Sequence, residues 1–270
     1  MRGKIEILVD KANSGDRDAL ESVILEIKDM VYHLSLKMLL FADDAQDATQ
    51  EILVRIITHL STFKGESRFM TWVYRVATNY LLTVKGKKSH EVAMPFEAYA
   101  DLIDTGQSDL VTHAKNEGEL LLLEEEVKVS CTHGLLLCLN EMSRMVYILG
   151  EILEFNSVEG AEILEMTPEN FRKQLSRSRV KIRHFLESKC GLVNPGNACR
   201  CKRKIDFLVE KQLINPGQLQ FARHSNRSID LIEKIDAVHR TVAIFRSVPV
   251  AKAPKHVMKQ VRKVVNAINF

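Results

Sequence analysis

Apolar residues recur at spacings of three and four along most of the chain, which is the period of an amphipathic helix. A clear instance lies between residues 42 and 60, where the apolar positions are Ala45, Ala48, Ile52, Ile56 and Leu60. Asp43 and Asp44 stand at its start, where acidic side chains can cap the first turn and suit the positive end of the helix dipole. The sequence lacks convincing alternation of period two, and glycine (12) and proline (6) are sparse. The pattern therefore predicts an all-α fold.

A second helix is predicted in the stretch FKGESRFMTWVYRVATN, residues 63–79. Gly65 interrupts the preceding helix, and Ser67 can cap the new one. Its apolar stripe is predicted to comprise Phe69, Val73, Val76, Ala77 and Tyr80. The single tryptophan, Trp72, shares a neighbouring face with Arg68 and Arg75. Two interpretations stay open: the indole packs in a core, or it stacks on bases of single-stranded nucleic acid while the cations track phosphates.

Helical periodicity predicts three consecutive helices in residues 139–188. Asn156 or Ser157 can cap the short middle helix, and the last helix has Thr167 as its cap and Pro168 at its first position. A short helix, a tight turn and a longer basic helix are typical of a helix-turn-helix, whose second helix enters the DNA major groove.

Polar and basic side chains flank the apolar stripe of this last helix, namely Arg172, Lys173, Ser176, Arg177, Arg179 and Arg183. Arginine and lysine can pair with guanine edges and neutralise phosphates, although an exposed basic face can also serve solubility alone. Residues 168–204 contain eleven Lys/Arg and two Glu, a net charge of +9, whereas residues 101–126 contain eight acidic residues and one Lys, a net charge of −7. This asymmetry indicates a localised basic surface for an anionic partner.

Composition narrows the class of protein further. The chain of 270 residues is 46% apolar, enough for real cores, yet it lacks a run of about 18 to 20 apolar residues that could span a bilayer. The charged N-terminus lacks an apolar signal core, so a cytoplasmic location is expected. Five cysteines at uneven spacing fit reduced thiols better than a disulfide framework. Walker, HExxH and nucleophile-elbow motifs are missing, so we do not expect an enzyme.

Together, these stretches resemble the extracytoplasmic-function (ECF) class of bacterial RNA polymerase sigma factors. The family's region 2.2 is similar to DDAQDATQEILVRIITHL, its regions 2.3 and 2.4 are similar to FKGESRFMTWVYRVATN, and its region 4 is similar to EMTPENFRKQLSRSRVKIRHFLE. The resemblance implies region 2 in residues 1–84, an acidic linker in 85–130, region 4 in 131–189 and a C-terminal extension in 190–270. The implied fold is two small helical domains joined by a linker, followed by a helical extension.

The resemblance implies a transcription initiation factor that binds core RNA polymerase and recognises promoter −10 and −35 elements. The implied polymerase-docking residues are Asp47, Gln50 and Glu51. The residues implied to hold the −10 element as single strand are Lys64, Arg68, Thr71, Trp72, Arg75 and Asn79. The residues implied to read the −35 duplex are the six on the basic helix, Arg172, Lys173, Ser176, Arg177, Arg179 and Arg183. An anti-sigma factor is a further possible partner. The alternative is a helix-turn-helix regulator that binds duplex DNA without polymerase.

Three features depart from, or refine, this picture. Glu165 occupies the turn position where glycine is common, so it must adopt another backbone conformation or accept strain. Gly160 stands where the family usually has an aliphatic residue, and we expect it to weaken local packing by about 1 kcal/mol. The acidic linker is expected to thread near the polymerase active site and the RNA-exit path.

The extension opens with CGLVNPGNACRCKRK. Cys190, Cys199, Cys201 and His184 could satisfy a zinc ion, neighbouring cations could lower thiol pKa values for a redox role, or the thiols could simply pack in a junction. Two apolar stripes follow, one from Leu231 to Phe245 and one formed by Val257, Val261, Val264 and Val265. These faces must bury against something, and we expect the extension to regulate region 4 or polymerase binding.

Overall fold

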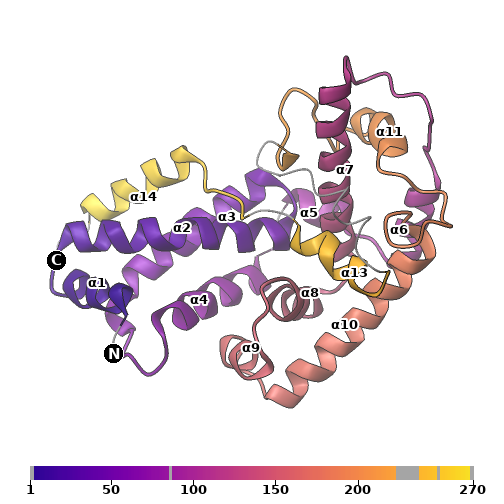
Figure 1. Cartoon of the computed structure of the whole chain (residues 1–270). Helices are drawn as coiled ribbons and strands as arrows, with labels where there is room; N and C mark the ends of the chain where they lie inside the picture. Colours follow the sequence, from indigo (N-terminus) through magenta and orange to yellow (C-terminus); the bar gives the residue numbers. More distant parts are fainter. Residues whose placement is uncertain (1–2, 85–86, 223–236, 248–249, 268–270) are drawn as a thin grey trace. The chain divides into compact units, whose positions relative to one another are not determined.

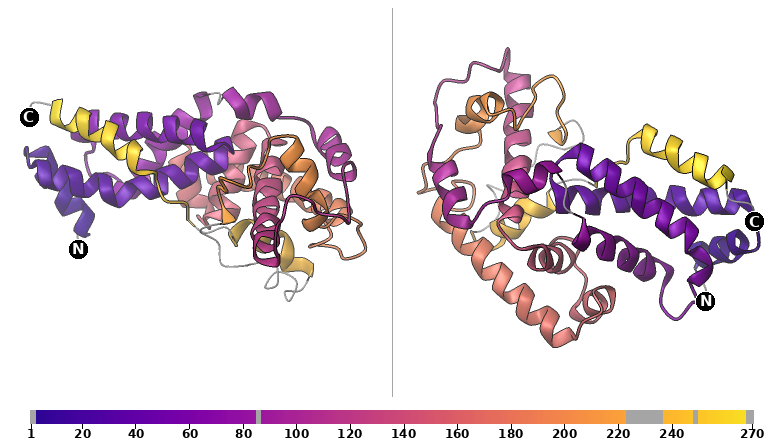
Figure 2. Two further views of the ribbon diagram at one scale, coloured as in Figure 1. Left: turned by 90° about the horizontal axis from the view of Figure 1, so that it is seen from above. Right: turned by 180° about the vertical axis from the view of Figure 1, so that it is seen from behind.

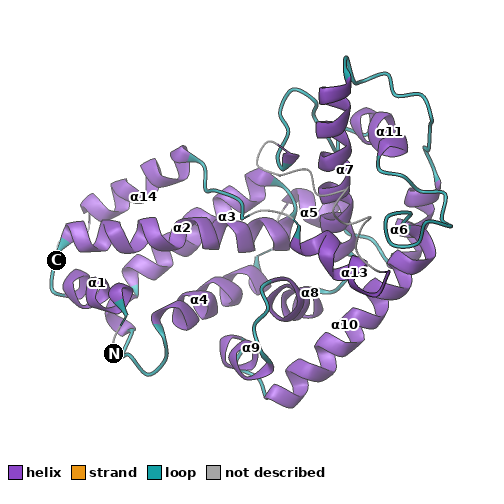
Figure 3. Ribbon diagram, viewed as in Figure 1, coloured by secondary structure: helices purple, strands orange, loops and turns teal. Residues whose placement is uncertain are grey.

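The computed structural model describes residues 3–84, 87–222, 237–247 and 250–267, and the regular elements in these ranges are helices (Figure 1, Figure 3). An isolated bridge between Cys190 and Cys199 is the one β-type pairing among them. The predicted all-α class is confirmed. In the same ranges, every helix is too short or too polar to cross a membrane. Leu231, Ile232 and Ile235, part of the first predicted stripe of the extension, lie outside the described residues.

The chain forms two compact units that do not follow its linear order. Unit 1 comprises residues 1–91, 155–171 and 250–270, and unit 2 comprises residues 92–154 and 172–249. The chain therefore passes from one unit to the other after residues 91, 154, 171 and 249. The boundaries predicted from sequence concern what each part binds, so they stay a prediction.

Unit 1 is built on three helices that pack together, α2 (Arg17–Leu39), α3 (Ala42–Thr58) and α4 (Phe69–Thr83). Its other elements are α1 (Lys4–Asn13), η1 (Leu60–Thr62), α5 (Lys87–Val92), α9 (Ser157–Ile163) and α14 (Lys255–Ala267). Fully buried apolar side chains at helical spacing join the three central helices, among them Ile24, Ile27, Ile52, Leu53, Phe69 and Val73. This core fixes the orientation of the outer faces of α3 and α4.

Two helix starts in unit 1 differ in detail from the prediction. Asp43 and Asp44 do lie in the first turn of α3, but the N-cap is Phe41. The N-cap of α4 is Arg68 and not Ser67, whose hydroxyl instead donates to the carbonyl of Arg68. The start of α4 is therefore set by the burial of Phe69 in the core rather than by a side-chain cap.

The helix-turn-helix segment forms as predicted, with α9 followed by α10 (Pro168–Lys189). Asn156 caps α9 in a reciprocal capping box with Glu159, and the backbone amide of Asn170 donates to the hydroxyl of Thr167 at 3.2 Å. Glu165 in the connecting turn has φ of +51°, the left-handed conformation that glycine adopts more easily. The expected strain at this turn is therefore present.

Gly160 does not leave the defect that we expected. A Cβ at this position would lie 2.4 Å from ring atoms of Phe171, which is fully buried. The aromatic ring therefore occupies the space that an aliphatic side chain fills in the expected arrangement. The glycine is a requirement of this packing and not a weakness, since any side chain would force the ring to move.

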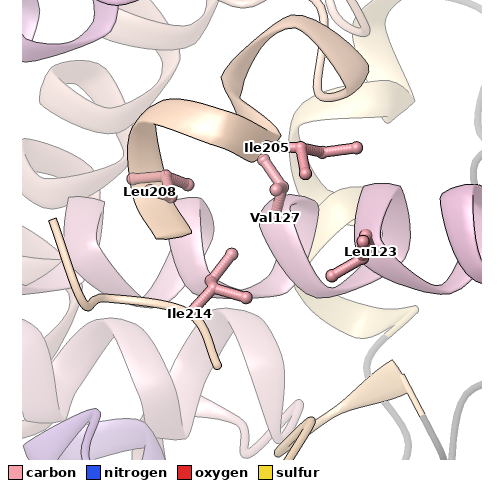
Figure 4. Packing of buried hydrophobic residues seen from close by; sticks show 5 residues of the cluster. All are labelled: Leu123, Val127, Ile205, Leu208 and Ile214. Carbon is pink, nitrogen blue, oxygen red and sulfur yellow. The ribbon is translucent and has the colours of Figure 1, made fainter. Parts of the chain in front are cut away.

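Unit 2 is organised around α7 (Glu117–Leu137). Its other elements are α6 (Phe96–Asp104), α8 (Glu141–Tyr147), the π-helical η2 (Ile148–Ile152), most of α10, η3 (Lys202–Lys204), α11 (Ile205–Glu210) and α13 (Ala237–Arg246). Figure 4 shows one part of its core, formed by Leu123, Val127, Ile205, Leu208 and Ile214. Two of these residues come from α7 and three from residues 205–214 of the extension, so this part of the extension is integral to unit 2.

Acidic residues of the predicted linker are used inside unit 2. Asp109 pairs with Arg203 at 2.6 Å, and Glu126 accepts hydrogen bonds from the backbone amides of residues 220–222 at 2.7–2.9 Å. The carboxylate of Asp206 in turn accepts from the amide of Thr112 at 2.8 Å. Contacts with the extension therefore hold the acidic stretch in place. These contacts give its acidic residues a structural role, whether or not the stretch also lies near the polymerase active site.

Candidate nucleic-acid interface

Four of the predicted −10 residues lie on one stripe of α4. Arg68, Trp72, Arg75 and Asn79 are separated by four, three and four positions, which places them on the same helix face. Arg68 and Asn79 are exposed, whereas Trp72 and Arg75 are half-buried. Thr71 lies half-buried beside the stripe, and Lys64 is exposed in the loop before α4. The structure therefore brings the six candidates to one helix and its entrance.

The indole of Trp72 belongs to an aromatic cluster. Its ring stacks on Phe69 with centroids 5.8 Å apart and an interplanar angle of 25°, and it contacts Phe63 at 5.8 Å. Phe63 and Phe69 meet edge-to-face at 5.3 Å. Since Phe69 is fully buried, the cluster holds the indole in a fixed orientation while part of it stays accessible. The indole is therefore packed on one side, as the core interpretation predicts, and its stacking on nucleic-acid bases stays a prediction.

Arg75 is engaged by α9 and the turn after it. Its Nη2 donates to the carbonyl of Glu162 at 3.3 Å, and the guanidinium lies 3.7 Å from the carboxylate of Glu162 and 3.9 Å from that of Glu165. Its Nε is buried without a hydrogen-bond partner in the described part of the chain. The guanidinium is therefore held by long contacts that leave its Nε without a hydrogen bond. A group that accepts shorter hydrogen bonds could replace Glu162 and Glu165 as its partner.

A second contact joins α4 to the same segment. The ring of Tyr74 meets that of Phe155 edge-to-face, with centroids 4.9 Å apart. Burial raises the pKa of Tyr74 to about 12, so its hydroxyl stays protonated. These contacts cover the flank of the stripe next to Arg75. Nothing in the sequence pattern signalled them, because Glu162 and Glu165 read only as polar positions of a short helix and its turn.

The predicted polymerase-docking residues lie on the outer side of α3. Asp47 and Glu51 are exposed and one turn apart, and Gln50 is half-buried beside them. Glu51 pairs with Arg55 at 3.1 Å, and the guanidinium of Arg55 lies 4.8 Å from the centroid of the Tyr80 ring. Arg55 and Tyr80 extend this surface onto α4. The i, i+4 spacing of Glu51 and Arg55 was a sequence signal for the pair, but not for its contact with Tyr80.

The predicted −35 residues occupy two adjacent stripes of α10. One comprises Arg172, Ser176, Arg179 and Arg183, and the other begins with Lys173 and Arg177. All six are exposed. The opposite face is buried through Phe171, Leu175, Ser178, Ile182, Phe185 and Leu186. The structure therefore confirms that the basic residues share the outward side of one continuous helix.

Arg179 is paired within unit 2. Arg179 forms an ion pair and hydrogen bond with Glu151 of η2, whose side chain is buried. Arg246 of α13 donates to the carbonyl of Glu151 at 2.8 Å and pairs with Glu154 at 2.6 Å. The position of Arg179 is therefore set by a carboxylate that the sequence analysis did not single out.

The cysteine-rich segment has a structural explanation. Within the described residues, no group of three or more His, Cys, Asp or Glu side chains is arranged to hold a metal ion, so Cys190, Cys199, Cys201 and His184 do not form the zinc site considered above. Burial raises the pKa of Cys199 to about 11 and also raises the pKa values of Cys190 and Cys201. The expectation that neighbouring cations lower these pKa values is wrong, because desolvation outweighs them.

Arg200 instead organises the loop that contains these cysteines. Its guanidinium donates to the carbonyls of Pro195 at 3.0 Å, Asn197 at 2.5 Å and Cys199 at 2.9 Å. The side-chain amide of Asn197 donates to the carbonyl of Cys190 at 3.2 Å. The NPGNACRC stretch therefore builds a hydrogen-bonded loop in which the thiols are packed.

Comparisons with known proteins agree with this arrangement. Residues 23–90, which include all of α3 and α4, match the family Sigma-70 region 2. The chain is 27% identical over 190 residues to the ECF RNA polymerase sigma factor SigW of Bacillus subtilis (strain 168), covering 69% of this chain and 98% of that protein. It is 24% identical over 183 residues to the RNA polymerase sigma-H factor of Pseudomonas aeruginosa, covering 67% and 92%.

A further relative is the ECF RNA polymerase sigma-E factor of Escherichia coli (strain K12), 26% identical over 179 residues, with 66% of this chain and 91% of that protein covered. About a third of this chain thus has no counterpart in these relatives. The alignments span nearly the whole of each relative, and the region 2 match includes α3 and the α4 stripe that contains Trp72. The region 2 match and these relatives support the assignment of this chain to the extracytoplasmic-function class of RNA polymerase sigma factors.

Proposed function

We propose that this protein is a transcription initiation factor that binds core RNA polymerase and directs it to promoters through their −10 and −35 elements. The observation that carries the proposal is the presence of two outward faces of different chemistry in one sigma-class chain. One is the α4 stripe with its half-exposed indole, and the other is the basic side of α10. Nucleotide chemistry would belong to the polymerase, and a cytoplasmic location follows from that partnership.

The α4 stripe suits melted DNA. A base that leaves the duplex loses its stacking energy, and an aromatic side chain can replace about 1–3 kcal/mol of it per base. The cluster of Phe63, Phe69 and Trp72 offers such a ring in a fixed orientation. Arg68 and Lys64 at the entrance of α4 would track phosphates, and Asn79 would contact a base edge. In this proposal Arg75 joins them once it exchanges Glu162 for phosphate.

The outward side of α10 suits duplex DNA. Its cations are exposed along a straight helix that follows a capped turn, the geometry of a recognition helix in the major groove. Arg172 and Lys173 near its N-terminus would reach base edges, whereas Arg177, Arg179 and Arg183 would bind phosphates. Ser176 adds a hydroxyl that can donate or accept.

The α3 surface suits a protein partner. Asp47, Gln50 and Glu51 would dock on the polymerase, and their acidic character calls for a partner surface that carries basic groups. An anti-sigma factor that binds this surface would compete with the polymerase.

Run-off transcription tests the proposal. Purified core polymerase and a library of genomic fragments are incubated with the chain, and we expect discrete transcripts that core polymerase alone does not produce. Trp72→Ala should lower their yield strongly, while Met70→Ala on the same helix but off the stripe should not. Fragment binding by the chain alone, without any gain on adding core polymerase, would contradict the proposal and favour an ordinary helix-turn-helix regulator.

A further inference from the structure

The last helix of the extension is seated on unit 1. α14 packs against α3 and, to a lesser extent, α2, and both views of Figure 2 show it running alongside them. Its apolar face is buried through Val257, Met258, Val261 and Val265. Three residues of the second predicted stripe of the extension, Val257, Val261 and Val265, are therefore buried within unit 1, and the side chain of Val264 lies outside the described part of the chain.

Polar contacts fix the direction of this segment along α2. The amide of Ala251 donates to Nδ1 of His33 at 3.0 Å, the amide of Ala253 donates to Asp29 at 2.8 Å, and Arg262 pairs with Glu21 at 2.5 Å. As the residue numbers of the extension rise, those of α2 fall. The segment therefore runs antiparallel to α2 and is anchored at both ends. Burial lowers the pKa of His33 to about 3, so its ring stays neutral and can accept this hydrogen bond.

The contact with α3 falls on the side that carries a docking residue. Nε2 of His256 and Oε1 of Gln46 lie 2.7 Å apart. Gln46 and Gln50 are one turn apart on the same face of α3, and Gln50 is half-buried. The exposed Asp47 and Glu51 follow on the adjacent face. α14 therefore borders the docking surface at Gln50.

Charge favours the same placement. Residues 250–267 contain five basic residues and no acidic residue, namely Lys252, Lys255, Lys259, Arg262 and Lys263. α3 carries four acidic residues, Asp43, Asp44, Asp47 and Glu51, against Arg55 as its one basic residue. A basic amphipathic helix on an acidic docking helix presents the kind of surface that we expect of the polymerase itself.

We propose that α14 is an intramolecular cover of the polymerase-docking surface and that it must leave α3 before core RNA polymerase binds. This inference rests on the proposed function. The cover is part of the chain, so it lowers the affinity of the free factor for polymerase without a separate inhibitor protein.

The test measures the affinity of the full-length chain for purified core polymerase. Val257→Asp/Val261→Asp places two carboxylates in the buried face of α14, and we expect the affinity to rise about tenfold or more, since an unpaired buried charge unseats the helix. The matched control is Val250→Asp, because Val250 precedes α14 and is already 61% exposed. Its affinity should equal that of the wild type.

Each outcome has a distinct meaning. Equal binding by the wild type and the double variant would overturn the cover and leave the proposed function intact. Failure of all three chains to bind core polymerase would overturn both. Faster amide hydrogen exchange in α3 of the double variant, with its circular dichroism unchanged, would confirm that the higher affinity comes from release of α14 in a folded chain.

A charge exchange gives an independent test if the double variant does not fold. Arg262→Glu and Glu21→Arg each break one exposed ion pair, so each should raise the affinity by up to about fivefold. The combined variant Glu21→Arg/Arg262→Glu restores the pair and should return to the wild-type affinity. Additive increases in the combined variant would contradict the cover, because the charges would then act on the polymerase separately.

Discussion

Two helices of this protein carry four outward side chains at the same spacing, and their surroundings differ. On α4 they are Arg68, Trp72, Arg75 and Asn79, and on α10 they are Arg172, Ser176, Arg179 and Arg183. The α4 set includes one ring fixed by two phenylalanines and one guanidinium held by α9. The α10 set is exposed throughout. The same spacing of outward side chains on two helices therefore does not give them the same exposure or the same neighbours.

The difference matches what each surface would read. Melted DNA offers the faces of separate bases, so a few oriented contacts matter most. Duplex DNA offers a dense line of phosphates, so the number of accessible cations sets the affinity and its salt dependence. Substitutions on the two helices should accordingly change different observables.

The largest effect is expected from the tryptophan. Trp72→Ala removes the stacking ring, and the loss of about 1–3 kcal/mol should lower the yield of open promoter complexes by about 5- to 150-fold. Permanganate reactivity of unpaired thymines in the −10 element measures this yield. Trp72→Phe should recover part of it, since a smaller ring still stacks on the cluster. Equal permanganate reactivity in all three chains would contradict the role of the indole.

The next effect concerns salt dependence on the α10 side. Arg177→Ala/Arg183→Ala should reduce the slope of log affinity against log salt by about 1.8, or about 0.9 for each lost phosphate contact. Binding of the holoenzyme to a −35 duplex at several salt concentrations measures the slope. Lys4→Ala, an exposed cation of α1 and not of α10, is the control and should leave the slope unchanged. Arg179→Ala should change the slope less than Arg177→Ala, because Glu151 already neutralises Arg179.

A smaller effect, on the free energy of unfolding, is expected where Gly160 of α9 contacts the Phe171 ring of α10. Gly160→Ala places a methyl group against the Phe171 ring. Overpacking of this kind costs about 1–3 kcal/mol, and the better helix propensity of alanine returns about 1 kcal/mol. Chemical unfolding should therefore show a loss of up to about 2 kcal/mol. Gly160→Ala/Phe171→Leu should recover part of the loss, whereas an increase in stability would show that the ring can move freely.

The smallest effect is expected from the contact between Glu162 of α9 and Arg75 of α4. Glu162→Gln weakens the ion pair with Arg75, which is partly exposed and worth less than about 1 kcal/mol. We expect binding of single-stranded −10 DNA to the holoenzyme to improve by up to about fivefold. Glu159→Gln on the same helix keeps its contact with the cap amide and serves as the control. A drop in binding for Glu162→Gln would mean that this carboxylate orients Arg75 for DNA instead of withholding it.

Much of the fold follows from local rules. The caps at Asn156 and Thr167, the start of α10 at Pro168 and the apolar stripes of α3 and α10 depend on neighbouring residues, so periodicity and capping preferences predict them. The left-handed Glu165 was foreseeable for the same reason, since the turn requires a conformation that only glycine adopts without strain.

The rest depends on contacts between distant segments. The pairing of Arg75 with Glu162 joins residues 87 positions apart, and the contact of Gln46 with His256 spans 210 positions. Hydrophobic periodicity identifies an amphipathic face but not the face that covers it. Gly160 shows the same limit, because its role depends on where the ring of Phe171 lies.

The extension contributes α13 to unit 2 and α14 to unit 1, and only residues 247–254 separate the two helices. Covalent attachment through a short flexible linker typically gives a segment an effective concentration of about millimolar at its binding site, and at such a concentration even weak contacts keep it bound most of the time. The same helix supplied as a free peptide would need a comparable concentration in solution to compete. Cutting the chain between α13 and α14 would therefore remove the advantage of covalent attachment without altering a single contact.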